Sequence, residues 1–255
     1  MNIVKSFVYN YVVPIVGRMY VGRNKFINVI YYHDIVKGEG QSFMQTNIDV
    51  YKRQMQYIVD NAYKTLRFDE LDSSNNLRFE NKKVVIAFDD GWLSNYTEIF
   101  DYMESLGLKY NVFLTIGEIG ENVNYLTWDM VRKMHSSGLV GFGVHTFTHP
   151  HVADMTGIDL QLEFDKANDV FQKELGYKPL DFCYPYGSCS EKSHEFLTTQ
   201  TDYQRIYTSS MMYSYKHNGR IIFGRNGINN DWPFVVFKNA LKGYYNVFSS
   251  LIKCK

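Results

Sequence analysis

The chain contains few residues that would divide it into parts or staple it together. It has 255 residues but only five prolines, and we find no internal repeat, low-complexity segment or linker. Its three cysteines, Cys183, Cys189 and Cys254, are odd in number and have no paired spacing. That usage fits a reducing compartment better than a disulfide-stapled secreted domain. With 45% hydrophobic residues, this length predicts one compact domain with a large core.

An excess of charge is also absent. Lys and Arg together number 27, as do Asp and Glu, so the formal net charge is zero. A balanced chain does not have the strongly basic composition typical of proteins that bind nucleic acids. It also gives no reason to expect strong attraction to anionic lipid. We therefore expect no nucleic-acid partner.

No apolar run of the sequence is long enough to span a membrane. The most apolar N-terminal stretch, residues 4–16, is interrupted by Asn10 and Pro14. No small-residue cleavage site follows it, so a secretory signal is not expected. The stretch could lie on a membrane surface, with Arg18 and Arg23 nearby. We favour a helix packed against the main domain.

These features predict two parts. Residues 1–25 form a helical N-terminal extension, and residues 26–255 form the main domain. The expected location is the cytoplasm, including the inner face of the membrane. The sequence leaves the oligomeric state open.

Two adjacent carboxylates follow the most apolar strand of the sequence. Residues 84–88 predict a buried strand of a parallel sheet, and Asp89, Asp90 and Gly91 come next. Burying two ionised carboxylates side by side is costly without a cation. One Asp could bind a metal while the other stays free as a base. The alternative is an ordinary Asp-Gly turn with both carboxylates in water, and the pair alone favours that alternative.

A cluster of histidines changes this balance. Three of the seven, His145, His149 and His151, lie within seven residues after an apolar run. Pro150 and the absence of a Glu after the first His argue against a helical zinc motif, so we expect His145 at a strand end and His149 in a loop. Two imidazoles and one carboxylate form a frequent catalytic zinc set. Together with the Asp pair, the cluster favours a metal site over a His-rich surface loop.

A third block, Pro185-Tyr186-Gly187, is a weak signal alone. Together the three blocks resemble the polysaccharide deacetylases of the nodulation-protein type, the fourth family of carbohydrate esterases. That family has Phe-Asp-Asp-Gly after an apolar strand, then His-Ser/Thr-x-x-His, then Pro-Tyr-Gly. The matching residues of this chain are Phe88, Asp89, Asp90, Gly91, His145, Thr146, His149, Pro185, Tyr186 and Gly187. The similarity runs from about residue 28 to residue 228.

Strands alternate with helical patterns along the chain, which predicts a parallel α/β fold. The resemblance implies the particular form, a distorted and incomplete (β/α)7 barrel of the polysaccharide deacetylase type. The candidate residues fall at the carboxyl ends of predicted strands, where such barrels keep their active sites.

The resemblance also implies a reaction, the metal-dependent removal of an N-acetyl group from an amino sugar of a bacterial glycan or glycolipid. Asp90, His145 and His149 would bind Zn²⁺, or another divalent metal such as Ni²⁺, Co²⁺ or Fe²⁺. Asp89 would be the general base. A backbone N–H near Tyr186 would stabilise the oxyanion together with the metal.

His33 is the candidate general acid. It follows Tyr32 at the end of the first predicted strand, and this pair resembles the N-terminal block of the branch that acts on poly-N-acetylglucosamine-like polymers. In that branch this His replaces a C-terminal His, and here no His follows His217. The alternative is that His33 only braces the strand end.

Some positions depart from the family pattern or remain open. Cys183 stands where the family has an Arg that orients the base, and Arg225 is the candidate substitute. Asp231-Trp232 could be a late motif or an ordinary turn. We expect His151 at the rim of the site. The remaining histidines are expected at the surface: His135, His194 and His217.

Two other functional classes stay open. One is a deformylase or amidohydrolase acting on another amide, because the motifs do not separate acyl groups. The other is a catalytically silent glycan-binding domain. The sequence does not identify the glycan.

Overall fold

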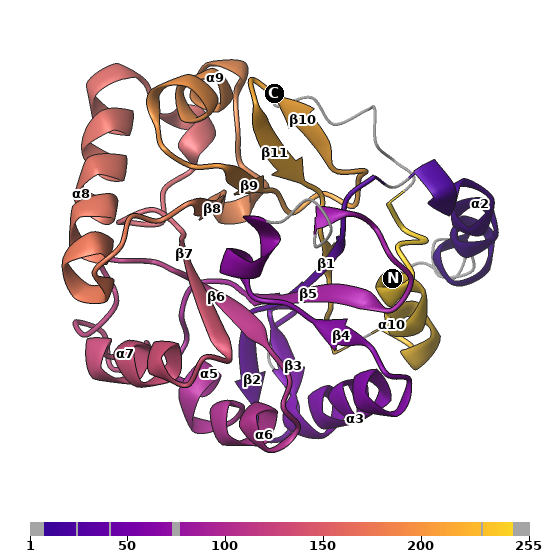
Figure 1. Ribbon diagram of the computed structural model, residues 1–255. Coiled ribbons are helices and arrows are strands. Elements are labelled where there is room, and N and C mark those ends of the chain that lie inside the picture. The colour runs from indigo at the N-terminus through magenta and orange to yellow at the C-terminus, as the bar shows by residue number, and fades with distance from the viewer. Residues whose placement is uncertain (1–7, 24, 41, 73–76, 231, 247–255) are drawn as a thin grey trace.

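The apolar runs form a ten-stranded sheet in the computed structural model, which describes residues 8–23, 25–40, 42–72, 77–230 and 232–246 (Figure 1). All its strand pairs are parallel except β10–β11. Along the sheet the order is β10-β11-β9-β8-β7-β6-β5-β1-β12, with β4 beside β5. The strands are β1 (Asn28–Tyr32), β4 (Lys64–Thr65), β5 (Lys83–Phe88), β6 (Tyr110–Leu114), β7 (Val140–Val144), β8 (Asp181–Cys183), β9 (Arg205–Tyr207), β10 (Tyr215–His217), β11 (Arg220–Phe223) and β12 (Asn226–Gly227). A separate pair consists of β2 (Asp34–Val36) and β3 (Gln45–Asn47).

Helices connect the parallel strands and lie around the outside of the sheet (Figure 1). This arrangement follows from the parallel pairing, since each crossover must return the chain to the same end of the sheet. The α-helices are α2 (Val13–Tyr20), α3 (Ile48–Asp60), α5 (Ser94–Thr97), α6 (Phe100–Ser105), α7 (Trp128–Ser136), α8 (Gly157–Leu175), α9 (Glu191–Gln200) and α10 (Phe234–Leu241). The short π and 3₁₀ segments are η1 (Val8–Val12), η2 (Val21–Arg23), η3 (Phe68–Asp72), η4 (Val152–Asp154) and η5 (Pro185–Gly187).

The chain links the two ends of the strand order. Strands β11 and β12 belong to opposite ends of the strand order, yet only Gly224 and Arg225 separate them in the chain. Strand β12 in turn pairs with β1 through Ile30 and Asn226. The result is the distorted, incomplete barrel that the sequence and its resemblance predict.

The seam at β12 is held by a buried group of amides. Asn28 Oδ1 accepts hydrogen bonds from Asn226 Nδ2 and Asn246 Nδ2, both at 3.1 Å. Asn226 Nδ2 also donates to Asn246 Oδ1 at 2.8 Å. Asn28 Nδ2 donates to the carbonyl oxygen of Ala240 in α10. These bonds join β1, β12 and the C-terminal helix at the β12 edge of the sheet.

Successive side chains of a strand point to opposite faces of the sheet, so every second side chain points into the barrel. In β5, Val85 and Ala87 pack in the inner cluster, whereas Val84 and Ile86 pack in the cluster that faces the helices. The next inner position after Ala87 is that of Asp89. The same alternation places three further residues at the top of inner rows: His33, His145 and Arg225.

Side chains cap two of the helices. Asn47 accepts hydrogen bonds from the N–H groups of Asp49 and Val50 and caps α3, and Thr127 caps α7. Ser94, although a residue type that favours helix caps, does not cap a helix. Its hydroxyl donates to Asp34 and accepts the N–H of Ile35, and the segment divides into α5 and α6. Ser94 is buried against β2, so tertiary contacts override the local capping signal.

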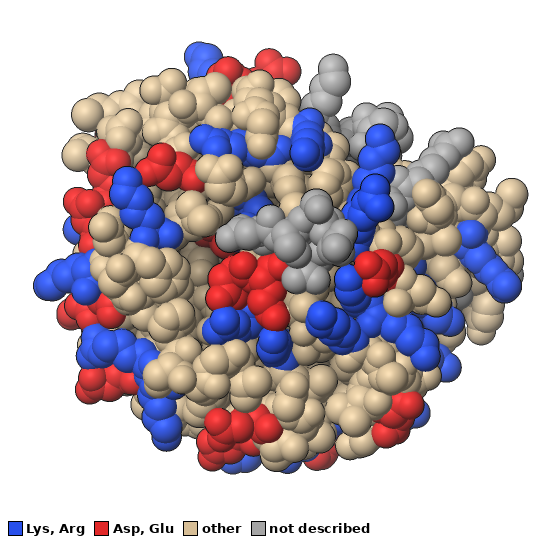
Figure 2. Space-filling model, in the orientation of Figure 1, with Lys and Arg blue, Asp and Glu red and all other residues tan. Residues whose placement is uncertain are grey.

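The helical part of the expected N-terminal extension comprises η1, α2 and η2, while residues 1–7 and 24 lie outside the described residues. Among the described helices, none has both the length and the hydrophobicity that crossing a bilayer requires. Figure 2 shows acidic and basic side chains side by side over much of the visible face, in agreement with the balanced composition.

Candidate active site

The adjacent carboxylates are buried. Asp89 is 2% exposed and Asp90 4% exposed, so the alternative of an Asp-Gly turn in water is wrong. Asp90 and Gly91 both have positive φ, 73° and 87°, and this sharp turn ends the strand. The N–H of Thr115 donates to the carbonyl oxygen of Asp90 and ties the turn to the end of β6.

Asp90, His145 and His149 come together as the sequence predicts. Asp90 Oδ1 lies 3.4 Å from His145 Nε2 and 3.2 Å from His149 Nε2. The three ligand atoms all lie within 4.8 Å of one another. Asp90 Oδ1 is buried and makes no hydrogen bond in the part of the chain that the structure describes. A buried carboxylate oxygen facing two imidazole nitrogens fits a divalent metal, which would satisfy all three atoms.

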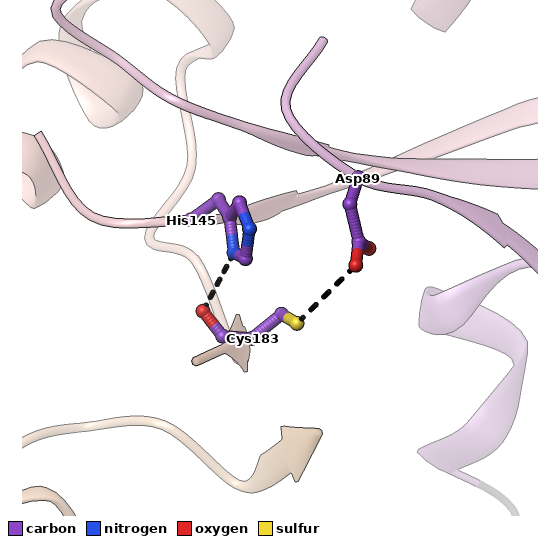
Figure 3. A group of neighbouring side chains, drawn as sticks. All are labelled: Asp89, His145 and Cys183. Atoms are coloured by element: carbon purple, nitrogen blue, oxygen red, sulfur yellow. Dashed lines mark hydrogen bonds between the residues drawn. The ribbon is translucent and has the colours of Figure 1, made fainter. Parts of the chain in front are cut away.

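The orientation of His145 suits a metal ligand. Its Nδ1 donates to the carbonyl oxygen of Cys183 at 2.8 Å (Figure 3). That bond fixes the tautomer and leaves the lone pair of Nε2 directed toward Asp90. His149 extends toward Asp90 from the loop that follows β7. Its backbone N–H donates a hydrogen bond to Thr146 Oγ1 at 3.0 Å.

The electrostatics of the trio favour a cation. Burial raises the pKa of Asp90, but the close approach of the His145 and His149 imidazoles holds it well below its ordinary value. Burial lowers the pKa of His145, yet Cys183, Asp90 and Asp89 together raise it well above its ordinary value. A cavity that stabilises positive charge on an imidazole also stabilises a divalent cation.

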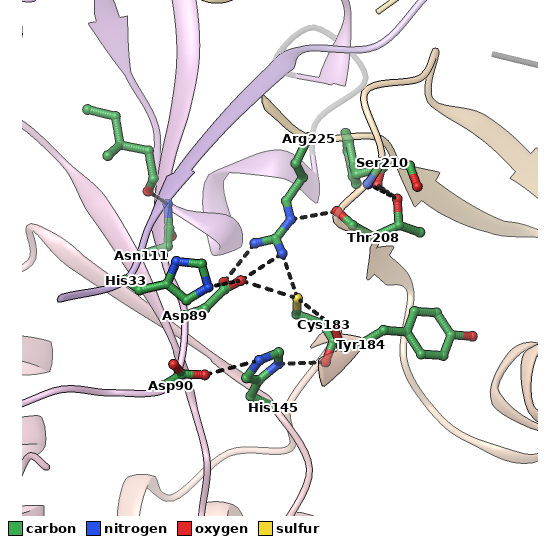
Figure 4. A network of polar contacts seen from close by, with 12 residues as sticks. His33, Asp89, Asp90, Asn111, His145, Cys183, Tyr184, Thr208, Ser210 and Arg225 are labelled. Atoms are coloured by element: carbon green, nitrogen blue, oxygen red, sulfur yellow. Dashed lines mark hydrogen bonds and ion pairs between the residues drawn. The ribbon is translucent and has the colours of Figure 1, made fainter. Parts of the chain in front are cut away.

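Asp89 has a different partner, Arg225. The guanidinium donates two parallel hydrogen bonds to the carboxylate, Nη1 to Oδ1 at 2.7 Å and Nη2 to Oδ2 at 2.8 Å (Figure 4). Arg225 is completely buried and its Nε also donates to the carbonyl oxygen of Thr208. Burial raises the pKa of Asp89, but the charge and hydrogen bonds of Arg225 bring it below its ordinary value. Asp89 is therefore ionised and held in one orientation.

Cys183 lies beside the guanidinium of Arg225. Cys183 Sγ accepts a hydrogen bond from Arg225 Nη2 at 2.9 Å and lies 4.0 Å from Asp89 Oδ2. Asp89, His145 and Cys183 also have the spacing of a metal site. However, Arg225 already engages the Asp89 carboxylate, and burial raises the pKa of the Cys183 thiol. The protonated thiol makes this second group the weaker metal site.

His33 lies on the same rim. Its side chain is 19% exposed, and its Nε2 lies 3.9 Å from Asp89 Oδ2. The ring packs edge-on against Tyr31, and the carbonyl oxygen of His33 accepts a hydrogen bond from Asn95. Burial lowers the pKa of His33 despite the opposing charges of Asp89 and Asp90. His33 is thus a neutral imidazole beside the base.

Tyr186 and His151 form an aromatic border beside the trio. Tyr186 is 61% exposed and has a left-handed backbone, with φ of 58°. Its ring stacks on that of His151, with 4.2 Å between the ring centroids, and packs edge-on against that of His149, with 4.6 Å between the centroids. Among the described residues, His151 belongs to neither group with metal-site spacing, which agrees with its expected place at the rim.

Two site residues were missed by the sequence analysis. Trp92 Nε1 donates to Asp90 Oδ2 at 2.9 Å, and its ring stacks on Tyr125. Its position directly after Asp-Asp-Gly was the available signal. Glu163 of α8 accepts the N–H groups of Phe147 and Thr148 and so holds the histidine loop. The signal there was an acidic residue within an apolar helical stripe.

Other sequence predictions fall away from the trio. The prediction of a surface position for His194 is wrong, since His194 is 8% exposed and hydrogen bonds to the Tyr184 hydroxyl at 2.9 Å. Helix α9 packs this side chain against β8. His135 and His217 are partly exposed. Asp231 lies outside the described residues, and Trp232 packs near Tyr245.

Comparisons with known proteins agree with this geometry. The family model for polysaccharide deacetylase matches residues 76–205. YxkH of Bacillus subtilis, which carries the name of a polysaccharide deacetylase, is 25% identical over 183 residues, covering 71% of this chain and 63% of that protein. The peptidoglycan-N-acetylglucosamine deacetylase of Bacillus cereus is 27% identical over 167 residues, covering 65% of this chain and 58% of that protein.

A similar fold is found among solved structures. The Streptococcus pyogenes deacetylase PplD in complex with acetate has a TM-score of 0.76 and 20% identity, covering 87% of this chain and 99% of that chain. The likeness at this identity concerns the fold, while the family model covers half of the sequence, including the Asp pair and both histidines. The chain belongs to the polysaccharide deacetylase family.

Proposed function

We propose that this protein is a metal-dependent hydrolase that removes the N-acetyl group from an amino sugar of a bacterial glycan or glycolipid. The observation that carries the proposal is the unsatisfied Asp90 Oδ1 facing the Nε2 atoms of His145 and His149. Zn²⁺ is the first candidate, because two imidazoles and one carboxylate are a common catalytic zinc set. When bound, such a cation lowers the pKa of water and polarises an amide carbonyl.

In this proposal Asp89 is the general base. Arg225 keeps its carboxylate ionised and fixed, while each oxygen retains a lone pair for a further hydrogen bond. A carboxylate with a lowered pKa is a weak base, but it suffices where water is already acidified. The oxygen of water attacks the acetamide carbon and its proton passes to Asp89.

His33 is the proposed proton donor to the leaving nitrogen. The amide C–N bond breaks only as the nitrogen is protonated, because an amide anion is a very poor leaving group. His33 stands beside the base and is neutral before the reaction, so it must gain a proton before it can donate one. We propose that the proton removed from water reaches the leaving nitrogen through His33. Acetate and the free amine are the products.

The chemistry around the trio supports an N-acetylated sugar as the substrate class. Tyr186 with His151 and Trp92 with Tyr125 present aromatic surfaces next to the metal ligands. Sugar rings pack their C–H faces on aromatic side chains of this kind. The name of the Bacillus cereus relative, a peptidoglycan-N-acetylglucosamine deacetylase, supports the same class.

An acetate-release assay tests the proposal. The zinc-loaded protein is incubated with oligomers of N-acetylglucosamine and, separately, with their N-formyl analogues. We expect acetate release that is lost on chelation and restored by divalent metal. Release of formate without acetate would replace the proposal with a deformylase. Absence of both products, with sugar binding retained, would make the protein a glycan-binding domain.

A further inference from the structure

Segments η1 and α2 expose an apolar face. Its side chains recur every three or four residues and therefore lie on one side of the helical segment. Their exposed fractions are high for apolar residues: Val8 39%, Val12 42%, Ile15 65%, Val16 38% and Met19 75%. We call these five residues the α2 stripe. Tyr11 at 60% and Tyr20 at 38% exposure flank it.

The opposite side of the helix fixes this orientation. Val13, Pro14 and Gly17 are buried. Gly17 lies against the main chain of Tyr244, and a side chain at Gly17 would overlap the Tyr244 carbonyl oxygen. The helix is therefore docked through its small residues, and the α2 stripe points outward as a consequence. Contiguous apolar surface of this kind marks an interaction site.

The two terminal segments of the chain carry charge of one sign. Residues 1–33 and 232–255 contain no Asp or Glu, yet they hold eight of the 27 Lys and Arg residues. Five of these, Arg18, Arg23, Lys25, Lys238 and Lys242, belong to the described residues, while Lys5, Lys253 and Lys255 lie outside them. The zero net charge of the whole chain conceals this asymmetry. In Figure 2 the α2 lobe at the right edge is mostly uncharged surface with a Lys or Arg group on it.

We propose that the α2 stripe binds the surface of an anionic lipid bilayer. An outward apolar face flanked by basic residues is the pattern of helices that lie in the membrane interface. The apolar side chains enter the headgroup–acyl boundary, while Arg18 and Lys25, both exposed, face anionic headgroups. This proposal does not depend on the reaction, and it can hold or fail whether or not acetate is released.

A second copy of the chain is the other candidate occupant. A symmetric dimer through the α2 stripe would bring two basic regions together without an acidic residue from either segment to pair with them. An anionic surface complements the same charges. The charge pattern therefore favours lipid over a second copy.

The test is vesicle flotation of the full chain with phosphatidylcholine vesicles that do or do not contain phosphatidylglycerol. We expect the wild type to float with the anionic vesicles, and Ile15→Glu/Met19→Glu to lower the bound-to-free ratio about tenfold or more. The matched control is Ile158→Glu/Leu162→Glu, which changes two residues of α8 with the same spacing and comparable exposure, 68% and 60% against 65% and 75%. This control should float like the wild type.

Two further measurements identify what binds to the α2 stripe. Arg18→Gln/Lys25→Gln should weaken flotation with anionic vesicles, and added salt should do the same. Light scattering without lipid gives the mass in solution. No flotation of the wild type, or equal loss in the α8 control, overturns the proposal. A wild-type dimer that becomes a monomer in Ile15→Glu/Met19→Glu assigns the stripe to a second copy and also overturns it.

Discussion

The two neighbouring aspartates differ because their partners differ. Asp89 continues the inner row of β5 and meets the guanidinium of Arg225. Asp90 follows the turn and faces the Nε2 atoms of His145 and His149. One carboxylate is paired with a permanent cation, whereas the other has an oxygen left for a metal. Their separate roles follow from these contacts.

Asp89→Asn should lower deacetylation by about 10²-fold or more, since an amide cannot take the proton that a general base removes. The metal ligands are untouched, so metal content should remain that of the wild type. Steady-state kinetics measures the deacetylation rate, and elemental analysis measures the metal content. A near wild-type rate would remove Asp89 from the role of base.

Arg225→Met should shift the acidic limb of the pH–rate profile toward higher pH. Burial alone raises the pKa of Asp89, and Arg225 supplies the charge and hydrogen bonds that bring it down. Without Arg225 the base becomes protonated at a higher pH than in the wild type. Arg220→Met, on β11 and partly exposed, is the control and should leave the limb in place. An unshifted limb in Arg225→Met would mean that another group titrates there.

His33→Ala should lower kcat on an acetamide far more than on an activated aryl acetate, whose leaving group departs without a proton. His33 Nε2 lies 3.9 Å from Asp89 Oδ2, and the proposed reaction needs a proton donor beside the base. Parallel kinetics on the two substrates give the comparison. Equal losses would show that His33 positions another group and is not the acid.

At the scale of elements, strand periodicity made much of the site predictable. His33, the two aspartates and His145 were placed at the ends of apolar runs, and parallel strands bring such ends to one rim. The bond between Asp89 and Arg225 joins residues 136 positions apart, so only the family's missing Arg suggested it. Short-range patterns could not place Ser94 or His194, because burial against β2 and β8 decided their roles.

Asn28→Ala should destabilise the seam between β1 and β12. It removes the acceptor of two amide donors and the donor to Ala240 within a buried group. Buried groups left unpaired cost roughly 1–3 kcal/mol each, so we expect a loss of about 2 kcal/mol or more in denaturant unfolding. Gln56→Ala, which removes an exposed amide bonded to Asp60, is the comparison and should change stability little. A loss no larger than that of Gln56→Ala would mean that the amides do not hold the seam.

At the scale of the whole molecule, the composition predicted the core, the alternation of strands and helices predicted a parallel α/β fold, and the family resemblance implied the barrel. Composition could not reveal that the two terminal segments hold basic residues and no acids, because the total charge is zero. Placement inside the cell stays a prediction. The family and the barrel are established, while the reaction rests on the site at its rim.

The metal content of the purified protein tests the account most directly. We predict one divalent metal per chain in the wild type, measured by elemental mass spectrometry, because Asp90, His145 and His149 have the spacing of one metal site. His145→Ala/His149→Ala should lose the metal, whereas His151→Ala, which changes only the rim, should retain it. Full metal occupancy in His145→Ala/His149→Ala would contradict the account.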